Sequence, residues 1–304
     1  MSNQKVAVLG CGLIGASWAA LFMANGYDVH AWDPDAAASA SLPERVGRPL
    51  AQLSELGVGK ASVRGRLVAG MPLEATVEGA FLVQENAPEN VPLKRALFAE
   101  VEKSVAPDAI IASSTSSLVW SDLSQGMAHP ARLVTAHPFN PPHLMPLVEL
   151  YGRDADILHR AESFYHSLGR KTVRLRRDAV GHIANRLASA LWREAVNLVA
   201  EGIADVSDID AALVHGPGLR WSVVGAHMAY HLGGGPGGIE HYLRHLGPSQ
   251  ERRWATLGTP KLTPEVCEQL IAGIAAEAAG RSIAELEAER DERLIAIMKT
   301  RNIP

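Results

Sequence analysis

The sequence predicts an α/β fold in which a doubly wound sheet is followed by an all-helical C-terminal domain. Three observations lead to this prediction. A glycine-rich turn joins an apolar run to a helical pattern at the start of the chain, short apolar runs then alternate with helical patterns up to residue 181, and only helical spacing follows. We therefore expect a Rossmann-type domain over residues 1–181 and a helical domain over residues 182–304.

The first predicted strand, residues 5–9, runs directly into the turn Gly10-Cys-Gly-Leu-Ile-Gly15 and an apolar helix to about Asn25. In such a turn the first glycine permits a tight bend, the second lets a pyrophosphate approach the backbone, and the third lets helix pack on strand. Free N–H groups at the helix start attract the anion. The turn residues expected at a dinucleotide are Gly10, Gly12, Leu13, Ile14 and Gly15.

The second predicted strand, residues 27–33, ends on Asp33. A carboxylate at this distance from the glycine turn is expected to bind the adenosine ribose hydroxyls and to repel a 2′-phosphate. The sequence therefore predicts NAD, rather than NADP, as the cofactor.

Further apolar runs predict the remaining strands and helices of the sheet domain. A long helical stretch over about residues 34–56 and a connection over 57–70 form an excursion after the second strand, where an extra helix pair is often carried. The basic stretch 170–177 alternates with apolar residues and indicates a strand with one solvated face; a phosphate-contacting role is the alternative. The other strands are expected at 80–84, 109–113, 133–137 and 147–151, and helices at about 91–105 and 121–127.

The C-terminal part repeats at helical spacing, with predicted helices at 183–200, 207–213, 264–278 and 283–298. Several of these helices have apolar stripes, and we expect a homodimer formed through this domain; burial of the stripes inside one subunit explains the same pattern. The glycine-rich segment 233–238 is expected to be a turn between helices.

Composition indicates a cytoplasmic enzyme without nucleic-acid or membrane partners. The net charge is −4, the pI is near 6.3, and aromatic residues make up 5% of the chain, so no general electrostatic attraction to nucleic acid is expected. Cys11 and Cys267 offer no disulfide framework and no zinc spacing. The first four residues lack the charged start and apolar core of a signal peptide.

A hydroxyl, an imidazole, an amide and a carboxylate follow or end apolar runs between residues 113 and 149. An imidazole accepts a proton at neutral pH, and a carboxylate on its other ring nitrogen fixes the tautomer. His137 and Glu149 therefore predict a proton-transfer pair beside a hydride acceptor. The alternative for His137 is a core histidine, and for Ser116 a helix cap or a Ser/Thr turn.

Six motifs in order resemble the 3-hydroxyacyl-CoA dehydrogenase superfamily over essentially the whole chain. They are the glycine turn with Asp33, Ala-Pro-Glu89 with Lys94, Ser113-Ser-Thr-Ser-Ser117, His137-Pro-Phe-Asn-Pro141, Pro146-Leu-Val-Glu149 and Gly181-His-Ile-Ala-Asn-Arg186. The resemblance implies His137 as general base, Glu149 as its orienting partner, and Ser116 and Asn185 as donors to the substrate oxygen. It also implies that Glu89, Lys94 and Asn140 surround the dinucleotide with the glycines and Asp33.

The C-terminal domain departs from the CoA-ester enzymes of that superfamily. Residues 216–225 replace a Gly-Tyr-Pro-Met-Gly-Pro type segment and contain Arg220 and Trp221. A guanidinium suits a free carboxylate, which a CoA thioester lacks, so both residues are predicted to bind substrate; an ion pair of Arg220 with an acid such as Asp208 and core packing of Trp221 are the alternatives.

The C-terminal part resembles L-carnitine dehydrogenases and shares part of its pattern with lambda-crystallin type L-gulonate 3-dehydrogenases. The resemblance rests on Leu219-Arg-Trp-Ser222, Tyr230-His-Leu-Gly-Gly-Gly235, Leu246-Gly-Pro248, Trp254 and Gly280-Arg-Ser-Ile-Ala-Glu-Leu-Glu287. The resemblance implies NAD-dependent oxidation of the 3-hydroxyl of a small 3-hydroxycarboxylate, with L-carnitine to 3-dehydrocarnitine as the lead reaction. Aromatic faces that suit a trimethylammonium group are available at Trp221, Tyr230, Tyr242 and Trp254. L-gulonate, a short 3-hydroxyacyl-CoA ester, and an NAD(H)-binding structural or sensor protein remain the alternatives.

Overall fold

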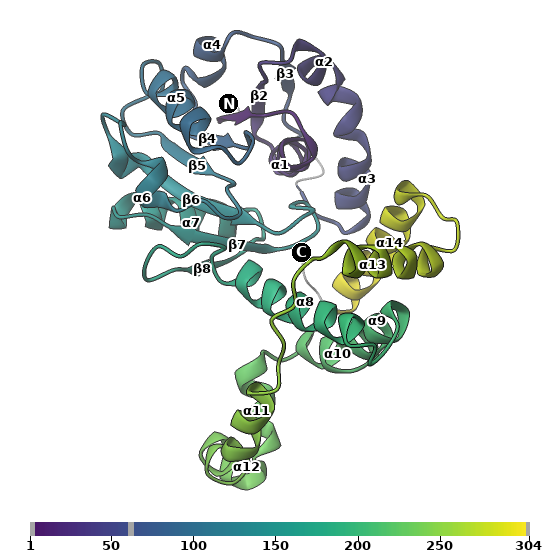
Figure 1. Ribbon diagram of the computed structural model, residues 1–304. Helices are drawn as coiled ribbons and strands as arrows, with labels where there is room; N and C mark the ends of the chain where they lie inside the picture. The colour runs from purple at the N-terminus through teal and green to yellow at the C-terminus, as the bar shows by residue number, and fades with distance from the viewer. Residues whose placement is uncertain (1–3, 60–63, 302–304) are drawn as a thin grey trace. The chain divides into compact units, whose positions relative to one another are not determined.

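The computed structural model describes residues 4–59 and 64–301 of the chain (Figure 1). The chain forms two compact units, Met1–Arg186 together with Ala288–Pro304, and Leu187–Glu287. The predicted domain division at residue 181 remains a prediction; the compact units place the end of the chain with the sheet rather than with the other helices.

The first unit contains an eight-stranded sheet in the order β3-β2-β1-β4-β5-β6-β7-β8. Every neighbouring pair is parallel except β6 and β7, which are antiparallel. The predicted Rossmann-type, doubly wound sheet is thereby confirmed. The strands are β1 (Lys5–Leu9), β2 (Asp28–Trp32), β3 (Leu67–Ala69), β4 (Leu82–Glu85), β5 (Ile110–Ser113), β6 (Leu133–Pro138), β7 (Leu147–Tyr151) and β8 (Lys171–Arg174).

Helices cover both faces of this sheet because its central strands are apolar on both faces (Figure 1). Val6 and Val8 belong to a core with Trp18 of α1, whereas Ala7 and Leu9 belong to the opposite core with α5 and α6. The helical elements of this part of the chain are α1 (Leu13–Ala24), α2 (Ala36–Arg45), α3 (Gly47–Glu55), α4 (Leu73–Val77), α5 (Val91–Val101), α6 (Trp120–Leu123), a 3-10 turn (Pro130–Arg132) and α7 (Ala155–Ser167).

The excursion after β2 differs in detail from the prediction. The helical stretch expected over 34–56 is two helices, α2 and α3, separated at Val46. The connection expected over 57–70 ends in strand β3, and helix α4 follows it. Both were missed because β3 has three residues and α4 five, too few for either periodicity to appear.

A series of side-chain hydrogen bonds connects helix α14, near the end of the chain, to helix α1. Arg48 and Gln52 of α3 donate to Asp291 of α14 (Ile283–Arg301) at 2.7 and 3.0 Å. The oxygen of Gln52 lies 2.7 Å from His143 Nε2, and His143 Nδ1 lies 2.7 Å from Ser17 Oγ on α1. Because the Gln52 oxygen can only accept, His143 donates from Nε2. Burial lowers the pKa of His143 to about 4.

The second unit is entirely helical within its described residues, which confirms the predicted character of the C-terminal region. The predicted helices at 183–200, 207–213, 264–278 and 283–298 are α8 (Ala184–Ala200), α9 (Val206–His215), α13 (Pro264–Ala278) and α14. The sequence missed α10 (Pro217–Trp221). It placed helices on either side of the glycine-rich segment without bounds, and these are α11 (Ala226–Gly233) and α12 (Gly238–Trp254). The glycine-rich segment is a turn with a 3-10 element at Gly235–Gly237, between α11 and α12, as expected.

Candidate active site

The glycine turn has the geometry of an anion cradle. Gly10 has φ +90°, and a Cβ there would lie 2.7 Å from the carbonyl oxygen of Asn86. A Cβ on Gly15 would lie 1.8 Å from the carbonyl oxygen of Gly10, so helix α1 needs glycine to pack this closely. A Cβ on Gly12 would meet nothing within 4 Å. The backbone is therefore open at Gly12, where a pyrophosphate is expected.

The start of α1 and the end of β2 complete this cradle. Gly12 caps α1 without a side-chain hydrogen bond, and the first turn carries no acidic residue, so its N–H groups suit a phosphate. Leu13 is exposed there. Asp33 accepts from the N–H of Cys11 at 2.7 Å and from the N–H of Asp35 at 2.9 Å. A carboxylate therefore lies directly beside the glycine turn, and the residues present fit NAD.

A cleft of about 430 Å³ lies at the carboxyl ends of β1, β4, β5 and β6. This is the edge at which open α/β sheets bind ligands. Seven predicted site residues line it: Ile14, Glu89, Lys94, Ser116, His137, Asn140 and Asn185. The other lining residues are Asn86, Ala87, Pro88, Ser114, Pro138 and Phe139.

His137 and Glu149 form a buried pair because the antiparallel register of β6 and β7 places them opposite each other. His137 Nδ1 lies 2.8 Å from Glu149 Oε2, and the side chains are 5% and 0% exposed. The other carboxylate oxygen, Oε1, accepts from the N–H groups of Ile183 and Ala184 at 2.8 and 3.0 Å. Burial alone raises the pKa of Glu149, but the hydrogen bonds from His137 and these two amides outweigh it and lower the pKa.

The serine-rich loop after β5 folds around the carboxylate of Glu89. Ser116 donates to Glu89 from both its N–H and its hydroxyl, the latter at 2.8 Å, and the Thr115 hydroxyl donates at 2.8 Å. Burial raises the pKa of Glu89, and the hydrogen bonds from Ser116 and Thr115 bring it below its usual value. Asn185 donates its amide to the Ser116 carbonyl at 3.0 Å. The two predicted oxygen-binding residues, Ser116 and Asn185, are therefore in direct contact.

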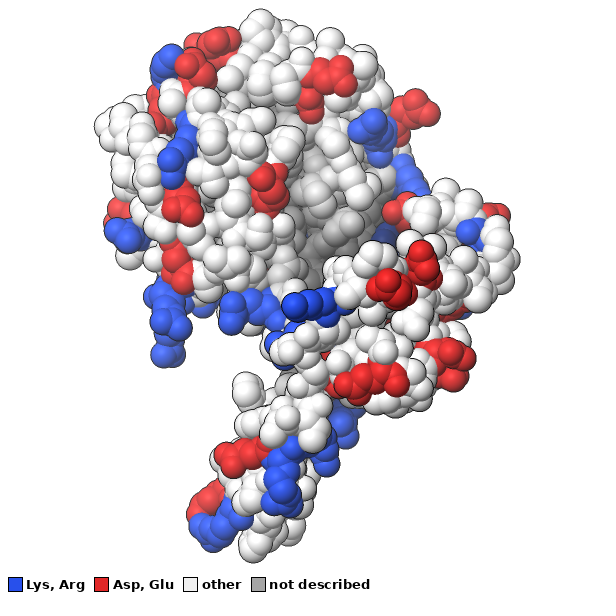
Figure 2. All heavy atoms as spheres, viewed as in Figure 1, with Lys and Arg blue, Asp and Glu red and all other residues white. Residues whose placement is uncertain are grey.

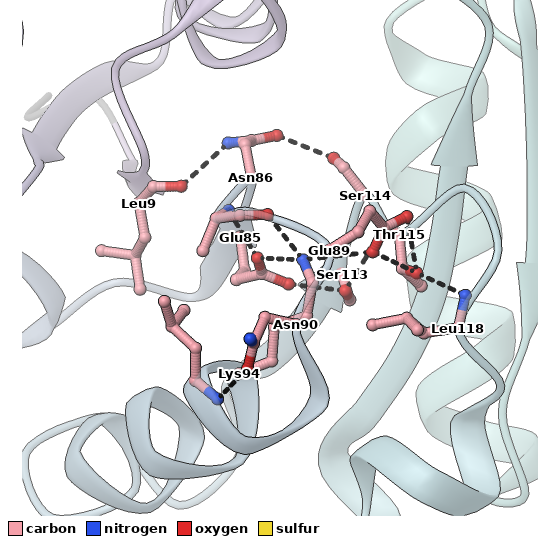
Figure 3. Close-up of polar contacts among 12 residues, drawn as sticks. Leu9, Glu85, Asn86, Glu89, Asn90, Lys94, Ser113, Ser114, Thr115 and Leu118 are labelled. Carbon is pink, nitrogen blue, oxygen red and sulfur yellow. Dashed lines mark hydrogen bonds and ion pairs between the residues drawn. The ribbon is translucent and has the colours of Figure 1, made fainter.

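Beneath this loop lies a buried ion pair that joins β4 to α5 (Figure 3). Lys94 Nζ lies 2.6 Å from Glu85 Oε1, with side chains 1% and 0% exposed, and 3.9 Å from Glu89 Oε2. Lys94 also donates to the carbonyl of Ala87 at 2.9 Å, and the Ser113 hydroxyl donates to Glu85 at 2.5 Å. The ammonium predicted to lie at the dinucleotide is thus held by protein groups at the floor of the cleft.

Sequence reasoning missed three groups in this arrangement: Glu85, Thr115 and His182. Glu85 ends a buried strand, and a carboxylate at the carboxyl end of such a strand is a signal that points to this edge. Thr115 lies in a run of similar residues, where no pattern selects one hydroxyl. His182 occupies a motif position that carried no prediction of its own.

Arg220 and Trp221, the predicted substrate residues, end helix α10 of the second unit. Arg220 is exposed and Trp221 is 38% exposed, so Trp221 is not a core side chain of this unit. Within the described residues, Arg220 and Asp208 form no ion pair. Tyr230 and Tyr242 of the same unit lie with ring centroids 5.0 Å apart.

One face of the molecule carries both signs of charge. In Figure 2, acidic and basic side chains are interspersed on both units. Among the described residues, no group of three or more His, Cys, Asp or Glu side chains is arranged to hold a metal ion. Over residues 4–59 and 64–301, no helix combines the length and the apolar character needed to span a membrane.

Known proteins match the chain over nearly its whole length. L-carnitine dehydrogenase of Streptomyces coelicolor is 42% identical over 299 residues, covering 97% of this chain and 94% of the relative. L-carnitine dehydrogenase of Oceanobacillus iheyensis is 39% identical and covers 97% of both chains. The crystal structure of 5-formyl-3-hydroxy-2-methylpyridine 4-carboxylic acid 5-dehydrogenase, an NAD+-dependent dismutase, has a TM-score of 0.83 at 26% identity and covers 98% of both chains.

Two family models account for both parts of the fold. Residues 5–179 match the NAD binding domain of 3-hydroxyacyl-CoA dehydrogenase, and residues 181–269 match its C-terminal domain. The first match agrees with the glycine cradle and Asp33, so NAD is the cofactor. With a buried imidazole–carboxylate pair beside that cradle and both family domains present in order, the chain belongs to the NAD-dependent 3-hydroxyacyl-CoA dehydrogenase family of oxidoreductases.

Proposed function

We propose that this protein oxidises the 3-hydroxyl of a small 3-hydroxycarboxylate, with L-carnitine to 3-dehydrocarnitine as the lead reaction and His137 as the general base. The observation that carries the proposal is the buried His137–Glu149 pair, of which His137 lines the cleft. Relatives about 40% identical over 97% of this chain are named L-carnitine dehydrogenases, which supports carnitine as the substrate.

Glu149 sets the chemistry of His137. Because the carboxylate engages Nδ1, Nε2 is the ring nitrogen that accepts the hydroxyl proton. The Glu149 carboxylate remains ionised near neutral pH, since its pKa lies below the usual value, and it stabilises the imidazolium that forms. NAD, when bound, accepts the hydride from the carbon that carries the hydroxyl.

Ser116 and Asn185 are proposed to donate to the substrate oxygen. Asn185 uses one amide N–H on the Ser116 carbonyl and retains a second one for substrate. The Ser116 hydroxyl donates to Glu89 and would rotate to the substrate when it binds. Glu89, Lys94 and Asn140 line the same cleft and are proposed, with Gly10, Gly12, Leu13, Ile14, Gly15 and Asp33, to surround the dinucleotide.

Recognition of the carboxylate is proposed to come from Arg220, with Trp221 against the trimethylammonium group. Arg220 is exposed and free of an ion pair with Asp208, so its guanidinium is available for a bidentate carboxylate contact. Trp221 exposes 38% of its surface, and an aromatic face attracts a quaternary ammonium.

We also propose a homodimer formed through the helical unit. Its described part exposes many large apolar side chains, and a subunit interface would remove them from water. Prominent among them are Trp192 (56%), Leu243 (60%), Trp254 (60%) and Ile271 (69%). Sedimentation equilibrium of the full chain tests this proposal, and a monomer at micromolar concentration would contradict it.

The function is tested by following NADH formation with L-carnitine, L-gulonate, 3-hydroxybutyrate and 3-hydroxybutyryl-CoA. We expect L-carnitine to give the highest kcat/KM. If only the CoA ester turned over, the proposed carboxylate recognition would be wrong.

The role of His137 is tested on the preferred substrate. His137→Ala is expected to lower kcat by about 10²- to 10⁴-fold, because proton transfer needs the imidazole, while the Kd for NADH stays within about twofold. His159→Ala removes an exposed imidazole on α7 and serves as the control, with wild-type kcat. Equal loss of turnover and NADH binding in His137→Ala would contradict a role in proton transfer.

A further inference from the structure

The backbone at His182 adopts a conformation that is uncommon for a non-glycine residue. His182 has φ 51°, in the left-handed region, and it is one of two described non-glycine residues with positive φ. Its side chain is 2% exposed. A buried non-glycine residue persists in this conformation where its surroundings hold it in place. The contacts of His182 therefore hold this residue in its left-handed conformation.

The ring of His182 is bound to the serine-rich loop. Its Nε2 lies 3.1 Å from the carbonyl oxygen of Thr115, which can only accept, so Nε2 carries a proton. Thr115 directly precedes Ser116 in the chain. The ring centroid of His182 also lies 5.1 Å from that of His137, with the planes at 43°. The side chain thus reaches the loop that carries one proposed substrate donor and lies against the proposed base.

The backbone that follows His182 is bound to the other half of the site. The N–H groups of Ile183 and Ala184 both donate to Glu149 Oε1, at 2.8 and 3.0 Å. The left-handed turn at His182 directs these two amides at the carboxylate before α8 begins at Ala184. His182 therefore binds the serine loop through its side chain, and the two residues that follow its left-handed turn bind Glu149 through their N–H groups.

We propose that His182 is a positioning residue, which locks the Ser116 loop and the Glu149 carboxylate into one geometry around His137. The proposal rests on the function proposed above. Burial lowers the pKa of His182, with the His137 ring acting in the same direction, so His182 stays neutral near pH 7. A neutral ring places no second positive charge against the proton that His137 accepts.

Three variants of the full chain distinguish the effect of the His182–Thr115 hydrogen bond from the effects of side-chain volume and of backbone strain at residue 182. His182→Phe keeps a ring without a donor, and His182→Gln keeps an amide N–H that can reach the Thr115 carbonyl. His182→Asn removes this reach while tolerating the left-handed conformation, so it serves if the phenylalanine variant fails to fold. His166→Phe is the matched control, since it removes the hydrogen bond between His166 of α7 and Thr172 of β8.

On the preferred substrate, His182→Phe and His182→Asn are expected to lower kcat by about 10- to 100-fold, with KM and the NADH Kd within about threefold, because small misplacements of catalytic groups have effects of this size. His182→Gln is expected to recover kcat to within about threefold, and His166→Phe to match the wild type. Wild-type kcat in His182→Asn, or equal loss in the glutamine and asparagine variants, would overturn the proposal.

Hydrogen exchange gives a second measurement that does not depend on turnover. Peptides covering residues 113–118 and 181–186 are expected to exchange faster in His182→Asn, and at the wild-type rate in His182→Gln. Unchanged exchange in His182→Asn overturns the positioning role. A wild-type enzyme inactive on every substrate, with these exchange differences present, would instead refute only the proposed function.

Discussion

Replacing Lys94 by methionine would leave the carboxylate of Glu85 buried without its counter-charge. The two groups lie 2.6 Å apart and are 1% and 0% exposed, so water cannot replace the lost ammonium. The methionine side chain fills a similar volume, and the change therefore isolates the charge. Removing one partner of a buried pair destabilises a protein by about 3–5 kcal/mol.

The surroundings of the pair support a value within that range. Glu85 would keep the hydrogen bonds from Ser113 and from the N–H of Ala87, at 2.5 and 2.6 Å, which offset part of the loss. The carbonyl of Ala87 would lose its donor, which adds about 1 kcal/mol or more. In a unit of this size, about 3–5 kcal/mol corresponds to a Tm decrease of roughly 6–20 °C.

Urea unfolding followed by circular dichroism measures the effect, with calorimetry for Tm. Lys103→Met is the control, because its partner Glu100 is exposed and the pair is expected to contribute less than about 0.5 kcal/mol. Lys94→Met combined with Glu85→Gln should recover most of the loss, since no buried charge remains. A loss below about 1 kcal/mol in Lys94→Met, or a double variant no more stable than the single one, would refute the reasoning.

Three further predictions concern pH, cofactor choice and substrate. Burial lowers the pKa of His143 to about 4 in the folded chain, against a value near 6.5 in the unfolded chain. Between these two pH values the unfolded chain binds more protons than the folded chain. The free energy of unfolding should therefore fall by up to about 3 kcal/mol as pH decreases from 6.5 to 4. His143→Gln should flatten the urea midpoint over that window, and an unchanged slope would contradict this. Asp33→Asn retains an acceptor for the Cys11 N–H but removes the charge, and should lower the kcat/KM preference for NAD over NADP at least about tenfold; an unaltered ratio counts against Asp33 as the ribose ligand. Arg220→Met should raise KM for L-carnitine about 10- to 100-fold, because the substrate carboxylate loses a charged hydrogen-bonding partner. Arg244→Met, which breaks an exposed ion pair with Glu240, is the control and should leave KM unchanged. Equal KM values in the two variants would exclude carboxylate binding by Arg220.

Local sequence patterns predicted the sheet strands that surround the cleft. The glycine turn, the strands that end at Leu9 and Ser113, and the helix after residue 90 are encoded by short-range periodicity and by residues with special backbone freedom. The same reasoning missed β3, α4 and α10, because elements of three to five residues obtain their stability from packing rather than from their own pattern. It also set no bounds for α11 and α12.

The site residues show the same division. The sequence by itself determined that an imidazole, a carboxylate and a dinucleotide-binding glycine turn are present. Residue types and their positions at the ends of predicted strands can be read directly from the order of residues in the chain. Only the tertiary structure decided that β7 runs antiparallel to β6, with Glu149 opposite His137. It also decided that Lys94 is paired with Glu85, and that His182 binds Thr115 across 67 residues of chain. These three features depend on contacts between residues that are distant in sequence: the direction of a strand, the partner of a buried charge and the hydrogen-bond acceptor of an imidazole. Local periodicity carries no information about such contacts.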